Sequence, residues 1–99
     1  MSETALLSKD VLIVKSEDIT KVANALSNPT RVQILHFIKE KEAEIQQIAE
    51  LIGQTKANAS AQIRILEDAG LVKTSYQPGI RGVKKLSSAS VKEVRLCLV

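Results

Sequence analysis

The stretch GQTKANASAQIRILEDAGLV, residues 53–72, decides how this chain folds. Thr55 is a good N-cap and Gly70 is a good stop, so the stretch predicts a helix over residues 55–69. The second half of this helix is rich in isoleucine and leucine, whereas the first half, TKANASAQ, is small and polar. One end of the helix can therefore pack in a core, and the other end has little bulk to bury.

Indexing this helix at 3.6 residues per turn separates its two sides. The predicted core side carries Ala59, Ile63 and Leu66. The residues predicted to lie opposite or on a flank are mostly small or polar: Ala57, Asn58, Ser60, Ala61, Gln62, Arg64 and Asp68. Small side chains let a backbone approach DNA closely, Asn and Gln can read adenine, and Lys and Arg can read guanine or hold phosphate. The surface is a candidate for DNA contact, although Ala, Asn and Ser also occupy many helix surfaces that bind nothing.

Helical spacing recurs three times before this stretch. The first helix is expected over residues 16–26, with Ser16 as its N-cap. The second begins at Asn28 and Pro29, because Asn can cap a helix and Pro fits the first helical position. The third is shorter, ends at Gly53, and carries its apolar residues on one face: Ile45, Ile48, Ala49 and Ile52.

Extended patterns occupy the ends of the chain and the region after Gly70. VLIVK, residues 11–15, is β-branched and predicts a short strand, and EVRLCLV, residues 93–99, alternates like another strand. LVKTSYQ and VKKLSS flank the turn sequence PGIRG, residues 78–82, which predicts a hairpin. MSETALLSKD, residues 1–10, shows no clear period and is expected to be frayed or to form a short turn.

The composition fits one domain over residues 1–99 with an aliphatic core. The hydrophobic fraction is 44%, and Phe37 and Tyr76 are the only aromatic residues. No apolar run is long enough for a membrane span, and the N-terminus lacks the pattern of a signal peptide. Cys97 is the only cysteine, so no intramolecular disulfide can form. These features predict a cytoplasmic protein.

Positive charge is concentrated in one third of the chain. Residues 53–85 contain six basic and two acidic side chains, a net charge of +4, although the whole chain carries only +3. Such a local excess is expected where an anionic partner binds.

The short turn at residues 53–55 and the basic hairpin after residue 70 together predict a winged helix-turn-helix. The fold class is then α+β and mainly α, with four helices, a β-hairpin wing and short terminal strands. In a helix-turn-helix, the second helix lies in the major groove and presents its N-terminal residues to base edges. This arrangement gives the small, polar first half of the 55–69 helix a role in contacting DNA bases.

Three segments carry a resemblance to a known family: ALSNPTRVQILHFIKE, IAELIG and SAQIRILEDAGLVKT. Together they resemble the ArsR-type family of winged-helix transcription regulators, over about residues 22–85. The resemblance implies sequence-specific binding to double-stranded DNA, with the 55–69 helix in the major groove and the 73–85 wing on the adjacent backbone or minor groove. It also implies a prokaryotic regulator that binds as a homodimer.

The resemblance implies two groups of DNA-binding residues. The first group lies on the helix, where Arg64 is expected to meet phosphate and the others to contact bases or nearby backbone: Thr55, Lys56, Ala57, Asn58, Ser60, Ala61, Gln62 and Arg64. The second group lies on the wing: Arg81, Lys84 and Lys85. Gln62 stands where the family often has histidine, so the family's base preference does not transfer to this position.

The chain departs from the metal-sensing members of the family. These use a cysteine pair at the start of the helix before the turn, where this chain has EAEIQQIAEL, residues 42–51. Soft metals need thiolate or imidazole ligands, so no metal site and no cofactor are expected. No acid, base and nucleophile are grouped in the sequence, which predicts that the chain is not an enzyme.

The first helix and the terminal strands, residues 11–15 and 93–99, are candidates for the homodimer interface because both strands are apolar. No residue identifies an effector. The alternative function is a winged-helix module for protein–protein interaction, with no specific DNA target and with an incidental basic face.

Overall fold

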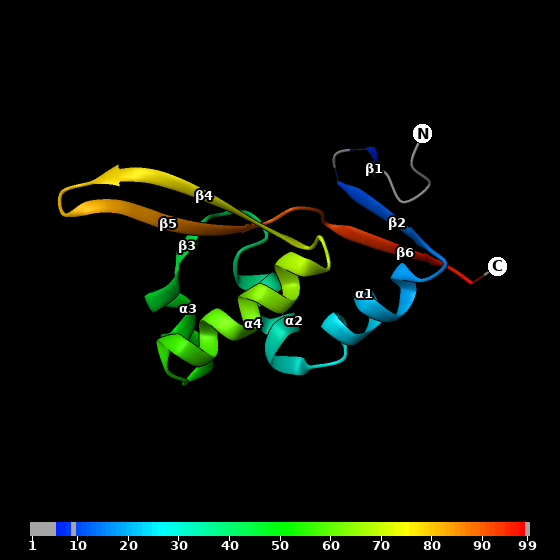
Figure 1. Ribbon diagram of the computed structural model, residues 1–99, viewed down its shortest axis with the longest axis horizontal. Coiled ribbons are helices and arrows are strands. Elements are labelled where there is room, and N and C mark those ends of the chain that lie inside the picture. Colours follow the sequence, from blue (N-terminus) through cyan, green and yellow to red (C-terminus); the bar gives the residue numbers. More distant parts are fainter. Residues whose placement is uncertain (1–5, 9, 99) are drawn as a thin grey trace.

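A computed structural model describes residues 6–8 and 10–98 of the chain. In chain order, its elements are β1 (Leu6–Ser8), β2 (Val11–Lys15), α1 (Asp18–Leu26), α2 (Pro29–Phe37), β3 (Ala43–Glu44), α3 (Ile45–Ile52), α4 (Lys56–Asp68), β4 (Val72–Gly79), β5 (Gly82–Ala89) and β6 (Glu93–Cys97). The molecule is elongated, with extents of 48 × 26 × 19 Å. The β4–β5 hairpin forms one end, the sheet containing β2 and β6 forms the other, and the helices lie between them (Figure 1).

The predicted helix boundaries are confirmed except at the start of α1. Asn28 Oδ1 accepts a hydrogen bond of 2.7 Å from Thr30 N, and Pro29 is the first residue of α2. Ser16 is not the N-cap of α1: it has a φ of 57°, and the N-cap is Glu17, whose side chain makes no capping hydrogen bond. The chain instead leaves β2 through a backbone turn in which Ile19 N donates to Ser16 O at 3.1 Å.

The strands form two small sheets with different topologies. In the terminal sheet, β2 pairs with β1 in antiparallel fashion and with β6 in parallel fashion, from Val11 opposite Glu93 to Lys15 opposite Cys97. In the wing sheet, β5 lies between β4 and the two-residue β3, and all pairs are antiparallel. The expectation for residues 1–10 is wrong at residues 6–8, which form β1, while residues 1–5 and 9 lie outside the described part.

The core is aliphatic, as the composition predicts, and fills the space between the helices and the two sheets. Its largest fully buried side chains come from several elements: Val14, Ile34, Ile38, Ile48, Leu66 and Leu71. Phe37 is only half-buried at the edge of this cluster. Within the described ranges, no helix is both long enough and apolar enough to cross a membrane.

Candidate nucleic-acid interface

The turn between α3 and α4 is fixed by a glycine and a helix cap. Gly53 ends α3 with a φ of 67°, a left-handed conformation that glycine adopts without strain. Gln54 follows, and Thr55 then caps α4 by accepting a hydrogen bond of 3.1 Å from Asn58 N at its Oγ1. Three residues therefore separate the two helices, and the exposed side chain that caps α4 also fixes the direction in which this helix starts.

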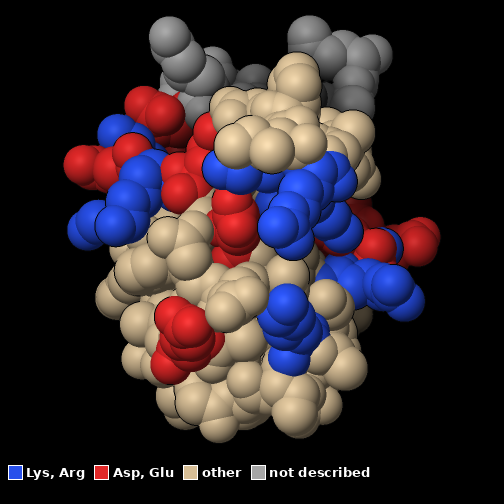
Figure 2. Space-filling view, turned by 90° about the vertical axis from the view of Figure 1, so that its left-hand side faces the viewer, with Lys and Arg blue, Asp and Glu red and all other residues tan. Residues whose placement is uncertain are grey.

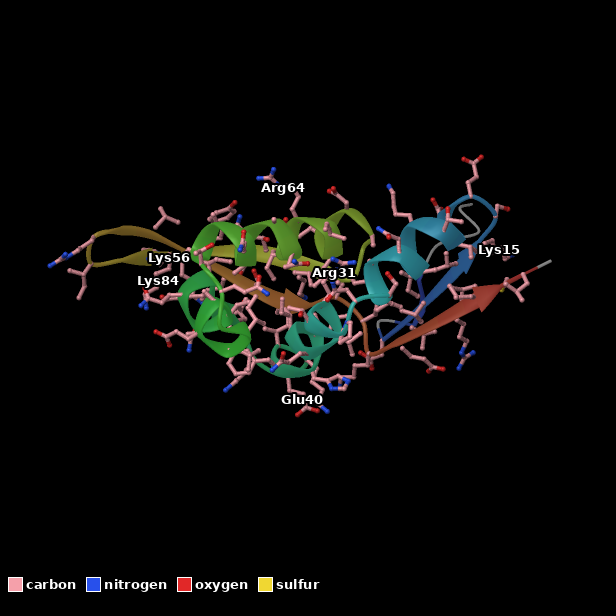
Figure 3. All side chains as sticks on the ribbon, turned by 90° about the horizontal axis from the view of Figure 1, so that it is seen from below. Lys15, Arg31, Glu40, Lys56, Arg64 and Lys84 are labelled. Carbon is pink, nitrogen blue, oxygen red and sulfur yellow. The ribbon has the colours of Figure 1, made fainter. Side chains whose placement is uncertain are left out.

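The two sides of α4 are as the helical spacing predicts. Ala59, Ile63 and Leu66 are buried. The residues on the outer surface are exposed, including most of the predicted DNA contacts: Thr55, Lys56, Ala57, Asn58, Ser60, Ala61 and Arg64. Arg64 extends away from the body of the molecule, on the side opposite Glu40 in the view of Figure 3. The exposed side chains of α4 are thus mostly small or polar. Few of them would keep a duplex away from the helix backbone.

Gln62 differs from the other predicted contacts because it is half-buried and already bonded. Its Oε1 accepts a hydrogen bond of 2.8 Å from Nη1 of Arg31. The guanidinium of Arg31 lies between α4 and the end of α1 (Figure 3). Arg31 is not among the site residues predicted from the sequence. Its place in the NPTR segment at the start of α2 was the only sequence feature that pointed to it.

The wing is a regular hairpin whose register runs from Val72 opposite Ala89 to Gly79 opposite Gly82. Ile80 and Arg81 form the two-residue turn between these glycines. A side chain at position 79 would bring Cβ within 2.9 Å of the carbonyl oxygen of Gly82, and Gly82 itself has a φ of 119°. The tight turn therefore requires both glycines, and it places Arg81 at the very tip of the wing.

The structure places one wing cation close to α4 and another far from it. Ser60 and Arg64 of α4 and Lys85 of β5 line one small cavity of about 130 Å³. Arg81 is four residues along the hairpin from Lys85, a separation of about 13 Å at the rise of an extended strand. Seen from the wing end, several Lys and Arg side chains lie beneath a group of uncharged atoms (Figure 2). Basic side chains therefore lie both beside α4 and along the wing.

Acidic side chains modify this basic surface in two places. Lys84 Nζ lies 3.4 Å from Oε2 of Glu44, at the start of α3. Glu67 also lines the cavity between α4 and β5, and its carboxylate accepts a hydrogen bond from the hydroxyl of Thr74. Arg64 and Lys85 thus line the same cavity as Ser60 of α4, while Lys84 has a carboxylate partner.

Apolar residues at the wing tip are a feature that the sequence prediction did not include among the contacts. Ile80 is fully exposed, and Val83 and Tyr76 are 70% and 66% exposed. Val83 lies opposite Pro78 beside the turn, whereas Tyr76 lies opposite Lys85, further along the hairpin. Exposed apolar groups that lie close together mark surfaces that contact a partner. The sequence feature that could have predicted them is their position in or near PGIRG, because isoleucine is not a typical turn residue.

No metal centre accompanies this surface in the part of the chain that is described. Across residues 6–8 and 10–98, no three or more His, Cys, Asp or Glu side chains lie close enough together to hold a metal ion. Cys97 is a free, half-buried thiol on β6.

A three-residue turn between two helices, followed by a basic antiparallel hairpin, defines this chain as a winged helix-turn-helix protein. Residues 28–74 match the family described as "Bacterial regulatory protein, arsR family". The helix-turn-helix region of this chain therefore matches the ArsR family, as the resemblance implied. The matched family and the relatives below are described as regulators of transcription, in agreement with the prediction that the chain is not an enzyme.

Individual relatives and solved structures agree with this assignment. The chain is 36% identical over 61 residues to an uncharacterised HTH-type transcriptional regulator of Methanocaldococcus jannaschii, covering 62% of this chain and 64% of the relative. It is 35% identical over 66 residues to a homologue of the cadmium resistance regulatory protein CadC of Staphylococcus aureus, covering 66% of this chain and 54% of the relative. The chain thus spans less than two thirds of the length of either relative.

A solved structure with the same fold comes from Mycobacterium bovis. It is the homodimeric winged helix-turn-helix DNA-binding domain of a possible ArsR-family regulator. The two structures superpose with a TM-score of 0.65 at 27% identity, over 75% of this chain and 65% of the other. The predicted fold class, mainly α with a β wing, is confirmed by this likeness.

Proposed function

We propose that this chain is a sequence-specific regulator of transcription that binds double-stranded DNA as a homodimer. In this proposal α4 enters the major groove, and residues 73–85 of the wing contact the adjacent backbone or minor groove. The observation that carries the proposal is the shared cavity lined by Ser60, Arg64 and Lys85. It joins the small, exposed side of α4 to the basic wing, so that one duplex could meet both.

The predicted contacts divide by chemistry. Arg64, Arg81 and Lys85 supply positive charge for phosphates, which fixes the position of the protein but carries no sequence information. Asn58, Ser60 and Gln62 carry the polar groups that reach base edges, and Ala57 and Ala61 allow close approach. Thr55 and Lys56 lie at the start of α4, where the backbone N–H groups and the helix dipole favour phosphate.

The wing tip is suited to the minor groove. Proteins that bind this groove often combine cations with apolar side chains that press against the base steps. Arg81 and the exposed Ile80 stand together in the turn, at the end of a hairpin long enough to reach a neighbouring groove. We therefore add Ile80, Val83 and Tyr76 to the proposed DNA contacts.

The proposed dimer uses the end of the molecule that lies away from the wing (Figure 1). There, β6 is an edge strand of the terminal sheet, with Leu96 42% exposed and Leu98 80% exposed. The M. bovis domain of the same fold is described as homodimeric, which supports a dimer for this chain. A two-fold axis would place two α4 helices about one DNA turn apart on a palindromic site. Such a regulator would act in the cytoplasm of a prokaryotic cell.

Binding to duplex DNA at increasing salt concentration tests the proposal against its alternative, a protein–protein module. DNA binding through several phosphate contacts releases counterions, so its affinity falls steeply as salt rises. We expect a steep, linear decrease of log K with log salt concentration for a bound duplex. The alternative would be favoured if purified protein bound no duplex even at about 50 mM salt, where such binding is strong.

A further inference from the structure

Arg31 is a buried cation whose neighbours are neutral oxygen atoms. Only 7% of the residue is exposed. Its Nε donates to the carbonyl oxygen of Ala25 at 2.8 Å, and its Nη2 donates to that of Asn24 at 3.0 Å. Both carbonyls belong to the last turn of α1, where the helix dipole attracts positive charge, and that of Asn24 also accepts from Ser27 N. These two bonds hold the guanidinium plane in place.

The third hydrogen bond of Arg31 sets the orientation of Gln62. Nη1 donates to Gln62 Oε1 at 2.8 Å. A guanidinium has only donors, so the oxygen of the amide must face Arg31 and the nitrogen must point the other way. Arg31 itself is held at two other points, which prevents it from turning to accommodate a different amide orientation.

The free end of Gln62 is therefore a hydrogen-bond donor. Among residues 6–8 and 10–98, no hydrogen bond from Gln62 Nε2 is found, and the residue is half-buried, not enclosed. Gln62 lies one turn after the exposed Asn58 on α4, so its outward group belongs to the proposed DNA-facing surface. A free glutamine reads adenine by pairing a donor with an acceptor, but this oxygen is already committed to Arg31.

We infer that Arg31 is a positioning residue that makes Gln62 a donor-only reader of the major groove, with a preference for guanine or thymine. The inference rests on the proposed function. Guanine presents two acceptors, N7 and O6, and thymine presents O4, whereas cytosine presents the N4 donor. Adenine retains N7 as an acceptor, but its N6 donor meets no acceptor on Gln62. Arg31 thus determines base preference without touching DNA.

The substitution Gln62→Glu tests this inference because it keeps an acceptor for Arg31 and reverses the outward group. One carboxylate oxygen would still accept from Nη1, and the other would face DNA as an acceptor. Gln62→Met is the matched control, since methionine has a similar length and supplies neither group. Each protein is used to select duplexes from a random DNA pool, and preferences are compared position by position. The added charge of Gln62→Glu lowers affinity for every sequence and cancels in this comparison.

For the wild-type chain, we expect about a tenfold preference for guanine or thymine at one position of each half-site. Gln62→Glu is expected to shift that position to cytosine or adenine and to leave the other positions unchanged. The Gln62→Met protein is expected to show no base preference at that position. An identical base preference in the wild-type and Gln62→Glu proteins would overturn the inference. It would also be overturned if Gln62→Glu showed no more base preference at that position than Gln62→Met. If the wild-type protein enriches no duplex, the proposed function itself fails.

Thermal unfolding gives a second readout that does not involve DNA. Gln62→Met leaves Nη1 of the buried Arg31 without an acceptor. The unfolding midpoint of this variant should therefore lie below that of the wild type. Gln62→Glu places a carboxylate beside this cation, so its midpoint should stay above that of Gln62→Met at neutral pH. Equal midpoints for the wild-type and Gln62→Met proteins would show that Arg31 does not hold Gln62 in solution.

Discussion

Lys84 on the wing and Glu44 at the start of α3 form an ion pair, with Nζ and Oε2 3.4 Å apart. Glu44 is also the N-cap of α3, in a capping box with Gln47. Glu44 thus begins the first helix of the helix-turn-helix, and its carboxylate pairs with a cation that was predicted to contact DNA. Both side chains are about half-exposed, so the pair contributes at most about 1 kcal/mol and can open when a phosphate competes.

Replacing Glu44 by Gln should strengthen DNA binding. The amide can still accept from the helix backbone, but it no longer neutralises Lys84 and no longer repels phosphate. We expect up to about a fivefold increase in affinity for all duplexes, the equivalent of about 1 kcal/mol, in a fluorescence anisotropy titration. Glu40→Gln is the control, because it removes the same charge on the side opposite Arg64 (Figure 3). Equal increases for the two variants would contradict a local role of the Lys84–Glu44 pair.

Arg64→Ala should weaken binding to every duplex by a similar factor, because a phosphate contact carries no sequence information. The slope of log K against log salt concentration should become less negative by about 0.9, the value for one lost phosphate contact. Affinities measured at several salt concentrations give this slope. Lys39→Ala removes an exposed cation at the end of α2 and should leave the slope unchanged. An unchanged slope in Arg64→Ala would remove Arg64 from the interface.

Thr55→Ala should destabilise the fold by about 1 kcal/mol, because Asn58 N loses the hydroxyl that caps α4. Chemical denaturation in the absence of DNA measures this loss separately from any effect on binding. Thr55→Ser retains the hydroxyl and should remain close to the wild type. If Thr55→Ala is as stable as Thr55→Ser, the cap observed at the start of α4 has no role in stability.

Charged groups on β6 should disrupt the proposed dimer. The double substitution Leu96→Glu and Leu98→Glu places one carboxylate on β6 and one just after it, at exposed apolar positions, and it should yield a monomer in sedimentation measurements. Val83→Glu changes an apolar residue of the wing that is also exposed, and this variant should remain dimeric. A double variant that sediments as the wild-type dimer would place the interface elsewhere, and a monomeric wild type at high concentration would refute the dimer.

Local rules predicted the features that local physics controls. The Asn28 and Thr55 caps, the Gly53 stop and the buried positions of α4 follow from neighbouring residues alone, and the structure confirms each. β3 was not predicted, because its two residues, Ala43 and Glu44, are too few to show an alternating pattern. They form a strand only because they pair with β5. The two terminal strands were predicted separately, but not their parallel pairing across more than 80 residues.

The candidate site shows the same division. Exposure along α4 and the basic wing were predictable, since periodicity and turn chemistry determine both. The bond between Arg31 and Gln62 was not, because it joins residues 31 positions apart and depends on how α1, α2 and α4 pack. The same packing turns Gln62 from a residue with two free polar groups into one with a single outward donor.

Selection of duplexes from a random DNA pool by the wild-type protein tests the central claim most directly, because it examines binding, sequence preference and symmetry together. The proposed function predicts enrichment of a palindromic site whose half-sites lie about one helical turn, or about 10 base pairs, apart. A pool that shows no enriched sequence after repeated rounds, at a salt concentration low enough for binding, would contradict the claim that this chain is a sequence-specific DNA-binding regulator.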